Sequence, residues 1–195
     1  MTTTPRLMAG VDEAGRGPLA GPVVAAAVIL SDGCSLEGLR DSKKLSEKKR
    51  EQLFDRIQEQ AVSYAIAIVD HEAIDRINIL QATLSAMQQS VLKLSIKPEY
   101  VRIDGNQSPH LPGYCVETII KGDDKVLAIS AASVLAKVTR DRLMQDYDQQ
   151  YPGYGFAQHK GYGTQSHRLA IEQLGPCAIH RRSFSPVSRY FAAVT

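Results

Sequence analysis

The sequence lacks any apolar segment long enough to cross a membrane. Its longest uninterrupted apolar run covers residues 23–30, whereas a membrane-spanning helix needs about 20 such residues. Residues 1–6 contain no apolar core of the kind that a secretion signal carries. We therefore predict a cytoplasmic protein that does not associate with membranes.

Cysteine is also scarce and scattered. The chain has Cys34, Cys115 and Cys177, and their separation excludes the C-x-x-C spacing typical of zinc sites and redox motifs. We expect reduced thiols that are mostly buried.

The composition is that of one globular domain. Of 195 residues, 44% are apolar and 23% are charged, and a chain of this length buries about 70% of its unfolded surface. We predict a single domain over residues 1–195. Its last part, residues 151–195, has five Lys or Arg against Glu172 alone, a local charge of +4. This basic portion suits contact with a phosphate backbone, although a solvated basic face fits the charge equally well.

Hydrophobic periodicity predicts strands alternating with helices. Alternating or continuous apolar residues favour strands at 7–12, 23–30, 64–69, 100–104 and 115–120. Apolar stripes at helical spacing favour helices from Ser46 onward, around 80–91, over 126–147 and over 165–173. This pattern predicts an α/β domain in which helices flank a mixed central sheet. The segment from 151 onward, broken by Gly and Pro, looks irregular.

Acidic residues follow apolar strands at several points. Asp12 and Glu13 end the first strand, Asp104 ends a later one, and Asp123 and Asp124 precede the long helix. If the strands of Asp12 and Asp104 are neighbours, repulsion between the carboxylates would raise a pKa or attract a hard cation such as Mg²⁺ or Mn²⁺. Spacing alone is equally consistent with acids that cap turns or favour a helix N-terminus.

Two nucleotide-binding motifs are approached but not matched. The glycines of residues 10–17 have the spacing of a P-loop, but Arg16 and Gly17 replace its Lys and its Ser or Thr. The glycines of residues 15–21 exceed the dinucleotide-binding spacing by one position, and Pro18 and Pro22 do not suit the helix that should follow. Neither nucleotide-binding function is predicted.

Several ordered segments resemble one known family. DEAGRGP at 12–18, followed by LAGPVVAAAV at 19–28, closely resembles the opening motif of bacterial ribonuclease HII, the type 2 ribonuclease H. In the order of that family's motifs there follow DSKKLS at 41–46, IDG at 103–105, KGD at 121–123, AASVLAKVTRD at 131–141, HKGY at 159–162 and HRRSF at 180–184. These segments extend across nearly the whole chain.

The resemblance implies a ribonuclease H-like fold and an endonuclease that cleaves RNA paired with DNA. It also implies incision on the 5′ side of a single ribonucleotide in duplex DNA, which leaves a 3′-hydroxyl and a 5′-phosphate and serves ribonucleotide removal. The implied cofactor is Mg²⁺ or Mn²⁺, acting as two ions. By motif, the catalytic and metal-binding acids are Asp12, Glu13, Asp104 and Asp123; Asp124 is the alternative to the last.

The resemblance also implies how substrate is bound. Backbone groups at Gly15 and Gly17 would approach the 2′-hydroxyl, Arg16 would hold a phosphate, and Tyr162 would pack on the sugar. The cations expected to bind phosphates are Lys43, Lys137, Arg181 and Arg182. The implied partners are RNA–DNA hybrids and ribonucleotide-containing DNA, and we expect a monomer. A catalytically silent nucleic-acid-binding module and a junction resolvase with the same fold are the alternatives.

Overall fold

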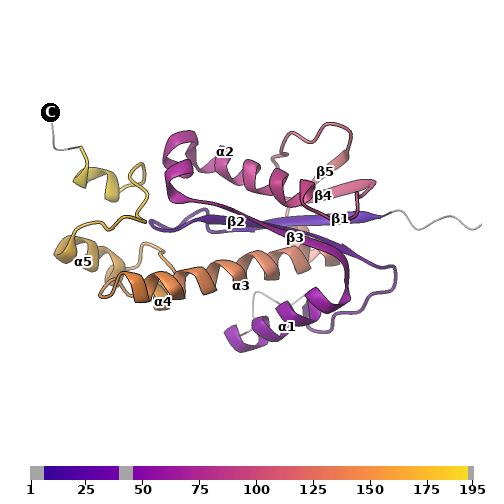
Figure 1. Ribbon diagram of the computed structural model, residues 1–195, viewed down its shortest axis with the longest axis horizontal. Coiled ribbons are helices and arrows are strands. Elements are labelled where there is room, and N and C mark those ends of the chain that lie inside the picture. Colours follow the sequence, from indigo (N-terminus) through magenta and orange to yellow (C-terminus); the bar gives the residue numbers. More distant parts are fainter. Residues whose placement is uncertain (1–6, 40–45, 193–195) are drawn as a thin grey trace, which may run out of the picture.

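A single mixed sheet forms the centre of the molecule. The computed structural model describes residues 7–39 and 46–192, and within them the sheet contains β1 (Met8–Ala14), β2 (Val23–Leu30), β3 (Ala61–Val69), β4 (Tyr100–Asp104) and β5 (Cys115–Ile119) (Figure 1). The strand order is β3-β2-β1-β4-β5. β1, β2 and β3 pair antiparallel, while β4 runs parallel to β1 and to β5. The predicted mixed α/β fold is confirmed.

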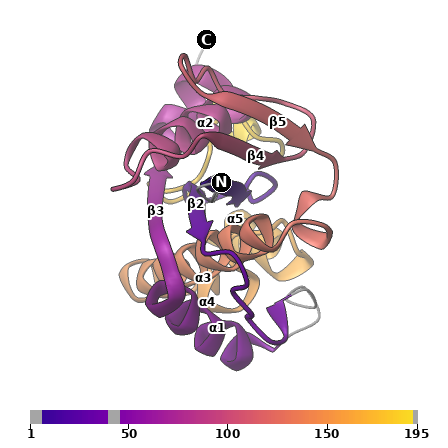
Figure 2. The same ribbon diagram turned by 90° about the vertical axis from the view of Figure 1, so that its right-hand side faces the viewer.

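Helices cover both faces of this sheet. α2 (His71–Leu92) lies on one face, and α1 (Glu47–Gln60) and α3 (Leu127–Gln150) lie on the other (Figures 1 and 2). The short segment η2 (Gly122–Asp124) precedes α3. Beyond α3 follow α4 (Phe156–His159), α5 (Gln165–Leu174) and η3 (Val187–Tyr190).

β2 is apolar throughout because both of its faces are buried. Val24, Ala26 and Val28 pack with α1 and α3, whereas the residues between them pack with α2. A central strand covered on both sides needs no polar face. The longest apolar run of the sequence is therefore the centre of the core.

Gly10 allows α3 to begin directly against β1. A Cβ atom at Gly10 would lie 2.2 Å from the Ala128 carbonyl carbon and 2.3 Å from the Ile129 nitrogen. No side chain fits at such distances, so glycine is required by close approach of two backbones. This contact brings the start of α3 and the preceding η2 to the β1 residues that follow Gly10.

The boundaries of several elements differ from the predicted ones. β1 continues to Ala14, so Asp12 and Glu13 lie within the strand rather than after it. β3 begins at Ala61, three residues early, and α2 begins at His71 with Asp70 as its N-cap. A residue with positive φ, Asn78, interrupts α2, and its side chain caps the second part through the Gln81 N–H at 3.1 Å. α4 was not predicted, because four residues are too few for a periodic pattern.

The prediction that the cysteines are mostly buried is wrong. Cys115 is exposed on the edge strand β5, and Cys34 and Cys177 are only partly buried. All three are free thiols, as expected.

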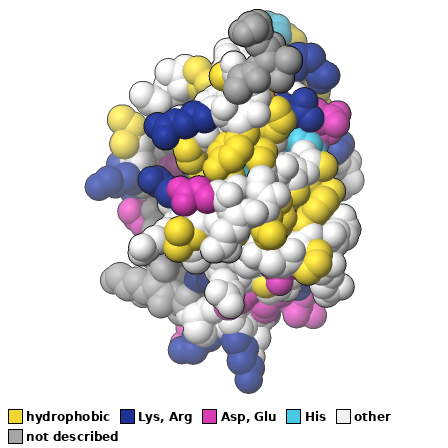
Figure 3. All heavy atoms as spheres, turned by 90° about the vertical axis from the view of Figure 1, so that its left-hand side faces the viewer, with side chains coloured by type: hydrophobic (Ala, Val, Ile, Leu, Met, Phe, Trp, Pro, Cys, Tyr) yellow, Lys and Arg dark blue, Asp and Glu magenta, His cyan; other side chains and the backbone are white. Residues whose placement is uncertain are grey.

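The basic C-terminal portion is less exposed than its charge suggests. Arg181 and Lys160 are buried, and the Lys160 ammonium contacts Glu47 at 3.3 Å. Arg168, Arg182 and Arg189 are exposed. The end of the molecule that α5 and η3 form shows basic side chains scattered among apolar ones rather than one continuous basic surface (Figure 3). Charge counting therefore overstated the basic face.

In residues 7–39 and 46–192, no helix combines the length and apolarity needed to cross a membrane. The predicted cytoplasmic location stays a prediction.

Candidate active site

Two acids lie at neighbouring positions of adjacent parallel strands, Asp12 within β1 and Asp104 at the end of β4. β1 pairs with β4 through Val11 and Ile103, so the next residues along each strand are Asp12 and Asp104. Asp12 is 5% exposed, and its Oδ1 accepts a hydrogen bond from the Glu13 N–H at 2.7 Å. The Ser133 side chain on α3 also hydrogen-bonds Asp12. The condition set from the sequence, that these strands be neighbours, is fulfilled.

The electrostatics of these carboxylates favour a cation. Burial, with the adjacent charges of Glu13 and Asp104, raises the pKa of Asp12 well above its ordinary value. Burial and Asp104 also raise the pKa of Glu13, although the guanidinium of Arg16 opposes this. Glu13 Oε2 is buried without a hydrogen-bond partner. Neutralising these groups with a bound cation would remove the repulsion and supply the missing partner.

The segment η2 lies next to the acids of β1 and β4. Asp104 Oδ1 accepts a 2.6 Å hydrogen bond from the Gly122 N–H, which fixes η2 against the end of β4. The next residue, Asp123, is buried, whereas Asp124 is exposed. The Ser130 hydroxyl donates to the Asp123 carbonyl oxygen. The fold thus gathers Asp12, Glu13, Asp104 and the start of η2 at one edge of the sheet.

These acids do not form a closed ligand set. Within the two stretches that the structure describes, no group of three or more His, Cys, Asp and Glu side chains has the geometry to hold a metal ion. The fit to a cation therefore rests on the chemistry of the carboxylates and on the unpartnered Glu13 oxygen. Hard oxygen ligands of this kind suit Mg²⁺ or Mn²⁺.

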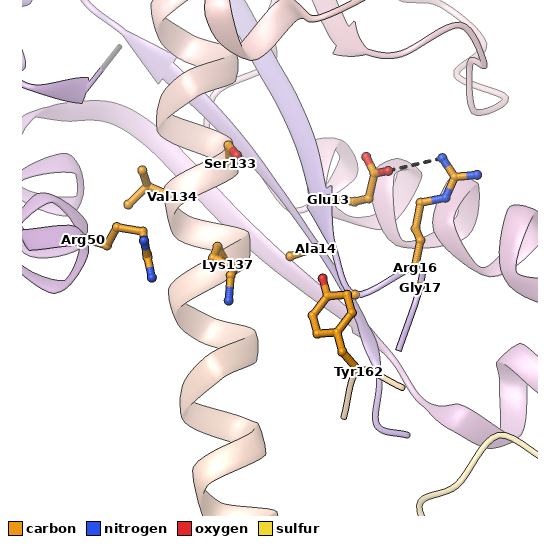
Figure 4. A pocket seen from close by; sticks show the side chains of 10 residues that line it. Glu13, Ala14, Arg16, Gly17, Arg50, Ser133, Val134, Lys137 and Tyr162 are labelled. Atoms are coloured by element: carbon orange, nitrogen blue, oxygen red, sulfur yellow. Dashed lines mark hydrogen bonds and ion pairs between the residues drawn. The ribbon is translucent and has the colours of Figure 1, made fainter. Parts of the chain in front are cut away.

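A pocket of about 410 Å³ opens beside Glu13 (Figure 4). It joins the 15–17 loop, α3, α1 and the turn that carries Tyr162. The residues that line it are Glu13, Ala14, Gly15, Arg16, Gly17, Arg50, Ser133, Val134, Lys137 and Tyr162. Five residues predicted to bind substrate therefore surround one cavity with the predicted catalytic Glu13.

A second hollow continues from the same acid toward α2. Its lining includes Glu13, Arg16 and Asp104, together with Leu80 and Leu84 of α2. Glu13 and Arg16 line both cavities. Glu13 therefore lies between the two hollows, and Asp104 lines the second of them.

The exposed groups of the first pocket are suited to contact a ligand. The Tyr162 ring is 44% exposed and lies next to Gly17, where an added Cβ would meet the ring at 3.7 Å. Arg16 is exposed and reaches Glu13 at 3.4 Å. Lys137 is ion-paired with Asp141, one turn along α3. Arg182, also predicted to bind substrate, does not line this pocket; it is exposed, with its guanidinium 4.7 Å from the centre of the Phe191 ring. Lys43 lies outside the described residues.

The prediction that Arg181 binds phosphate needs correction. Arg181 has no exposed surface, and its guanidinium donates to four carbonyl oxygens of the loop between β1 and β2: Gly15 at 2.6 Å, Arg16 at 2.9 Å, Gly21 at 2.9 Å and Pro22 at 3.2 Å. A cation so enclosed cannot reach a phosphate. It shapes the loop that carries Arg16 instead.

Arg140 supports the same loop from α3. It is 1% exposed and donates to the carbonyls of Pro22 at 3.0 Å, Ala20 at 3.1 Å and Lys160 at 2.9 Å. An added Cβ at Gly15, where φ is 100°, would lie 2.1 Å from the Arg140 Nε. Gly15 therefore permits both the left-handed turn and the close approach of the arginine.

Sequence reasoning missed two polar lining residues, Ser133 and Arg50. Ser133 is one helical turn before Lys137 on α3, and this i, i+4 spacing within the AASVLAK segment was the available signal. Arg50 comes from α1, and nothing in the sequence distinguished it from the other cations of that helix.

Comparison with known proteins establishes the family. The family model described as ribonuclease HII matches residues 9–187. The chain belongs to the ribonuclease HII family. A family member from Geobacter metallireducens is 57% identical over 185 residues, which cover 95% of this chain and 86% of the relative. The resemblance inferred from the motifs is confirmed, and the chain is a ribonuclease H endonuclease that acts on RNA–DNA hybrids.

Solved structures confirm the fold. The ribonuclease H2 from Pyrococcus horikoshii OT3 superposes with a TM-score of 0.79 at 29% identity, over 94% of this chain and 96% of that one. Bst-RNase HIII, solved in complex with Mn²⁺, gives a TM-score of 0.75 at 17% identity, over 98% of this chain and 71% of that one. The second similarity concerns the fold alone.

Proposed function

We propose that this member of the family incises duplex DNA on the 5′ side of a single embedded ribonucleotide, as well as cleaving the RNA strand of hybrids. The products are a 3′-hydroxyl and a 5′-phosphate. The observation that carries this proposal is that Glu13 lines the same pocket as Gly15, Arg16, Gly17 and Tyr162. One proposed catalytic acid, Glu13, and a loop able to recognise ribose would thereby contact the same substrate segment.

The residues that would hold Mg²⁺ or Mn²⁺ are Asp12, Glu13, Asp104 and Asp123. Bound divalent ions supply an activated water and stabilise charge on the phosphodiester oxygens, two ions being the arrangement that serves both ends of the cleaved bond. The chain's own contribution is to hold these carboxylates close together on β1 and at the end of β4. Ser133 and the Gly122 N–H orient Asp12 and Asp104 by hydrogen bonds.

Recognition of the ribonucleotide depends on the loop that Arg181 and Arg140 support. The 2′-hydroxyl is the only group that distinguishes the target from a deoxynucleotide, and it can both donate and accept a hydrogen bond. Gly15 and Gly17 have no side chain to prevent the backbone from approaching it. Arg16 would exchange its contact with Glu13 for a phosphate, and Lys137 would contact a second phosphate.

A paired cleavage assay tests this proposal. Two duplexes of identical sequence are compared, one with a single ribonucleotide and one entirely deoxy, each with EDTA, Mg²⁺ or Mn²⁺. We expect cleavage of the first duplex only, on the 5′ side of the ribonucleotide, and only with metal. Equal cleavage of both duplexes would reject recognition of the 2′-hydroxyl, and cleavage of branched all-DNA substrates would indicate a resolvase. Cleavage in EDTA would reject the metal-dependent reaction.

A further inference from the structure

Three histidines lie together under the turn that carries Tyr162, and the proposed reaction uses none of them. His167 and His180 are 0% and 1% exposed. The rings of His159 and His167 stack with their centres 4.4 Å apart and their planes 16° apart, and Phe156 packs edge-on against both. Burial lowers the pKa of His167 and of His180 to about 4 in each case, so both rings are neutral near pH 7. A neutral imidazole has one donor nitrogen and one acceptor nitrogen.

The backbone at Cys177 determines which nitrogen of His180 carries the proton. The Cys177 N–H donates to His180 Nδ1 at 2.9 Å, and the Cys177 thiol lies 3.1 Å from the same nitrogen. A nitrogen that accepts the N–H cannot carry a proton of its own. The carbonyl oxygen of Cys177, at 3.3 Å from Nδ1, therefore receives no hydrogen bond from it. The proton of His180 must be on Nε2.

This assignment propagates to His167. The two Nε2 atoms of His180 and His167 are 3.1 Å apart, and because His180 donates, His167 accepts there. The proton of His167 is then on Nδ1, which lies 2.9 Å from the Tyr162 carbonyl oxygen. The hydrogen bonds form a chain with one direction, from the Cys177 N–H through both rings to Tyr162.

The turn that ends in Tyr162 is held at each of its residues. Arg140 donates to the Lys160 carbonyl at 2.9 Å, and the Gly161 N–H donates to His159 Nδ1 at 3.2 Å. The Gly161 carbonyl accepts from the Leu19 N–H at 2.8 Å. The Tyr162 carbonyl accepts from His167 Nδ1 and from the Thr164 N–H at 2.8 Å. The backbone is fixed, while the Tyr162 ring is left exposed to the pocket.

We propose that His167, oriented by His180, is a positioning residue that sets the Tyr162 ring for packing on the sugar of the cleaved ribonucleotide. The inference rests on the proposed function, because it assumes that Tyr162 contacts this sugar. Neither histidine touches substrate. The physical reason is that the Tyr162 ring is exposed and lies 5.9 Å from the Arg140 guanidinium on one side only, so its direction depends on how its own backbone is held, and His167 is the side chain that bonds this backbone at the Tyr162 carbonyl.

Substitutions at His167 test the coupling to Tyr162. His167→Phe removes both hydrogen bonds, whereas His167→Asn retains an N–H donor at the position of Nδ1. We expect His167→Phe to lower kcat/KM on the single-ribonucleotide duplex about tenfold, the value of one lost hydrogen bond, and His167→Asn to restore most of it. In a Tyr162→Ala background, His167→Phe should cause no further loss, provided that thermal unfolding shows each variant folded.

An additive loss in the Tyr162→Ala background would overturn the proposal, since a purely structural histidine lowers activity whatever stands at 162. A measurement on the wild-type protein avoids variants that do not fold. Nitrogen-15 NMR of the imidazoles should show the proton on Nδ1 of His167 and on Nε2 of His180, and the opposite arrangement in either ring would contradict the chain. Failure of the proposed function is a separate result: the wild-type enzyme would then not cut the single-ribonucleotide duplex.

Discussion

Asp12 combines deep burial, two acidic neighbours and a hydrogen bond from α3. Replacing its charge by an amide of the same shape removes a cation ligand without opening a cavity. We expect Asp12→Asn to reduce cleavage by at least about a thousandfold while binding to an RNA–DNA hybrid changes less than a few fold. Cleavage kinetics and fluorescence anisotropy measure the two effects. Equal loss of binding and cleavage would contradict a catalytic role for Asp12.

The adjacent acids Asp123 and Asp124 allow the same substitution to be compared at a buried and at an exposed position. Asp123 is buried beside the Gly122–Asp104 hydrogen bond, and Asp124 points to solvent. We expect Asp123→Asn to lower kcat by about a hundredfold or more, since it removes a cation ligand, and Asp124→Asn to retain activity within about twofold. If Asp124→Asn instead caused the larger loss of kcat, Asp124 and not Asp123 would be the fourth catalytic acid.

For single residues, the sequence predicted which side chains could take part in catalysis better than it predicted whether those side chains are buried or exposed. The acids stood out because a carboxylate after an apolar strand is unusual, and the structure places Asp12 and Asp104 on adjacent strands. Arg181 was misinterpreted, because a basic residue in a basic segment gives no sign that four carbonyl oxygens, the farthest 166 positions away in sequence, surround it.

The contact between β1 and α3 positions the site at the element scale. Because Gly10 touches the backbone of Ala128 and Ile129, we expect Gly10→Ala to push the helix start away from the strand. The expected loss is about 3 kcal/mol in the free energy of unfolding, together with a fall in kcat because Ser133 and η2 move relative to Asp12. Urea denaturation and cleavage kinetics measure these effects.

Gly33→Ala is the control for this substitution. Gly33 has a φ of 79° but no atom within 4 Å of an added Cβ, so it measures backbone strain alone. We expect it to cost about 1 kcal/mol with unchanged kcat. Similar effects of both substitutions on kcat would show that the β1–α3 contact does not position the site.

Periodicity predicted the long elements and failed at short ones. The apolar stripe of α3 and the apolar run of β2 were sufficient to predict these elements, because each one packs along its length against a continuous hydrophobic core. α4 and η2 are too short for a periodic pattern, and the break at Asn78 depends on a single side-chain cap. The residues that position Tyr162 lie on different elements, Arg140 on α3 and His167 on α5, and periodicity does not show that these helices meet at one turn.

The whole molecule should become less stable in mild acid because of its buried histidines. The pKa values of His167 and His180 are lowered to about 4 by burial, against about 6.5 in an unfolded chain. Between these values the unfolded chain binds protons that the folded one does not, so stability is full above pH 6.5 and falls as the pH drops toward 4. We expect about 2–3 kcal/mol less stability at pH 5.5 than at pH 7.5.

Asp12 titrates in the opposite sense, since its pKa is raised in the folded state and protonation relieves repulsion there. The pKa of Glu13 is raised as well, so denaturation of the Asp12→Asn/Glu13→Gln double variant at both pH values isolates the histidine contribution. Equal stability of that variant at pH 5.5 and 7.5 would contradict neutral, buried imidazoles.

The site as a whole is assembled from distant segments. The loop of residues 15–22 is held by Arg140 and Arg181, and the acids come from β1, β4 and η2. A family resemblance could indicate these residues because their order along the chain is distinctive. Their contacts depend on three-dimensional packing that no local pattern contains. The single domain, the monomeric state and the cytoplasmic location stay predictions.

The central claim is that these distant acids form one binding site for divalent ions. Calorimetric titration of Mn²⁺ into the wild-type protein, Asp12→Asn and Asp124→Asn tests it most directly. We predict saturable binding to the wild-type protein and to Asp124→Asn, and binding at least about tenfold weaker in Asp12→Asn. Undiminished binding to Asp12→Asn would contradict the account.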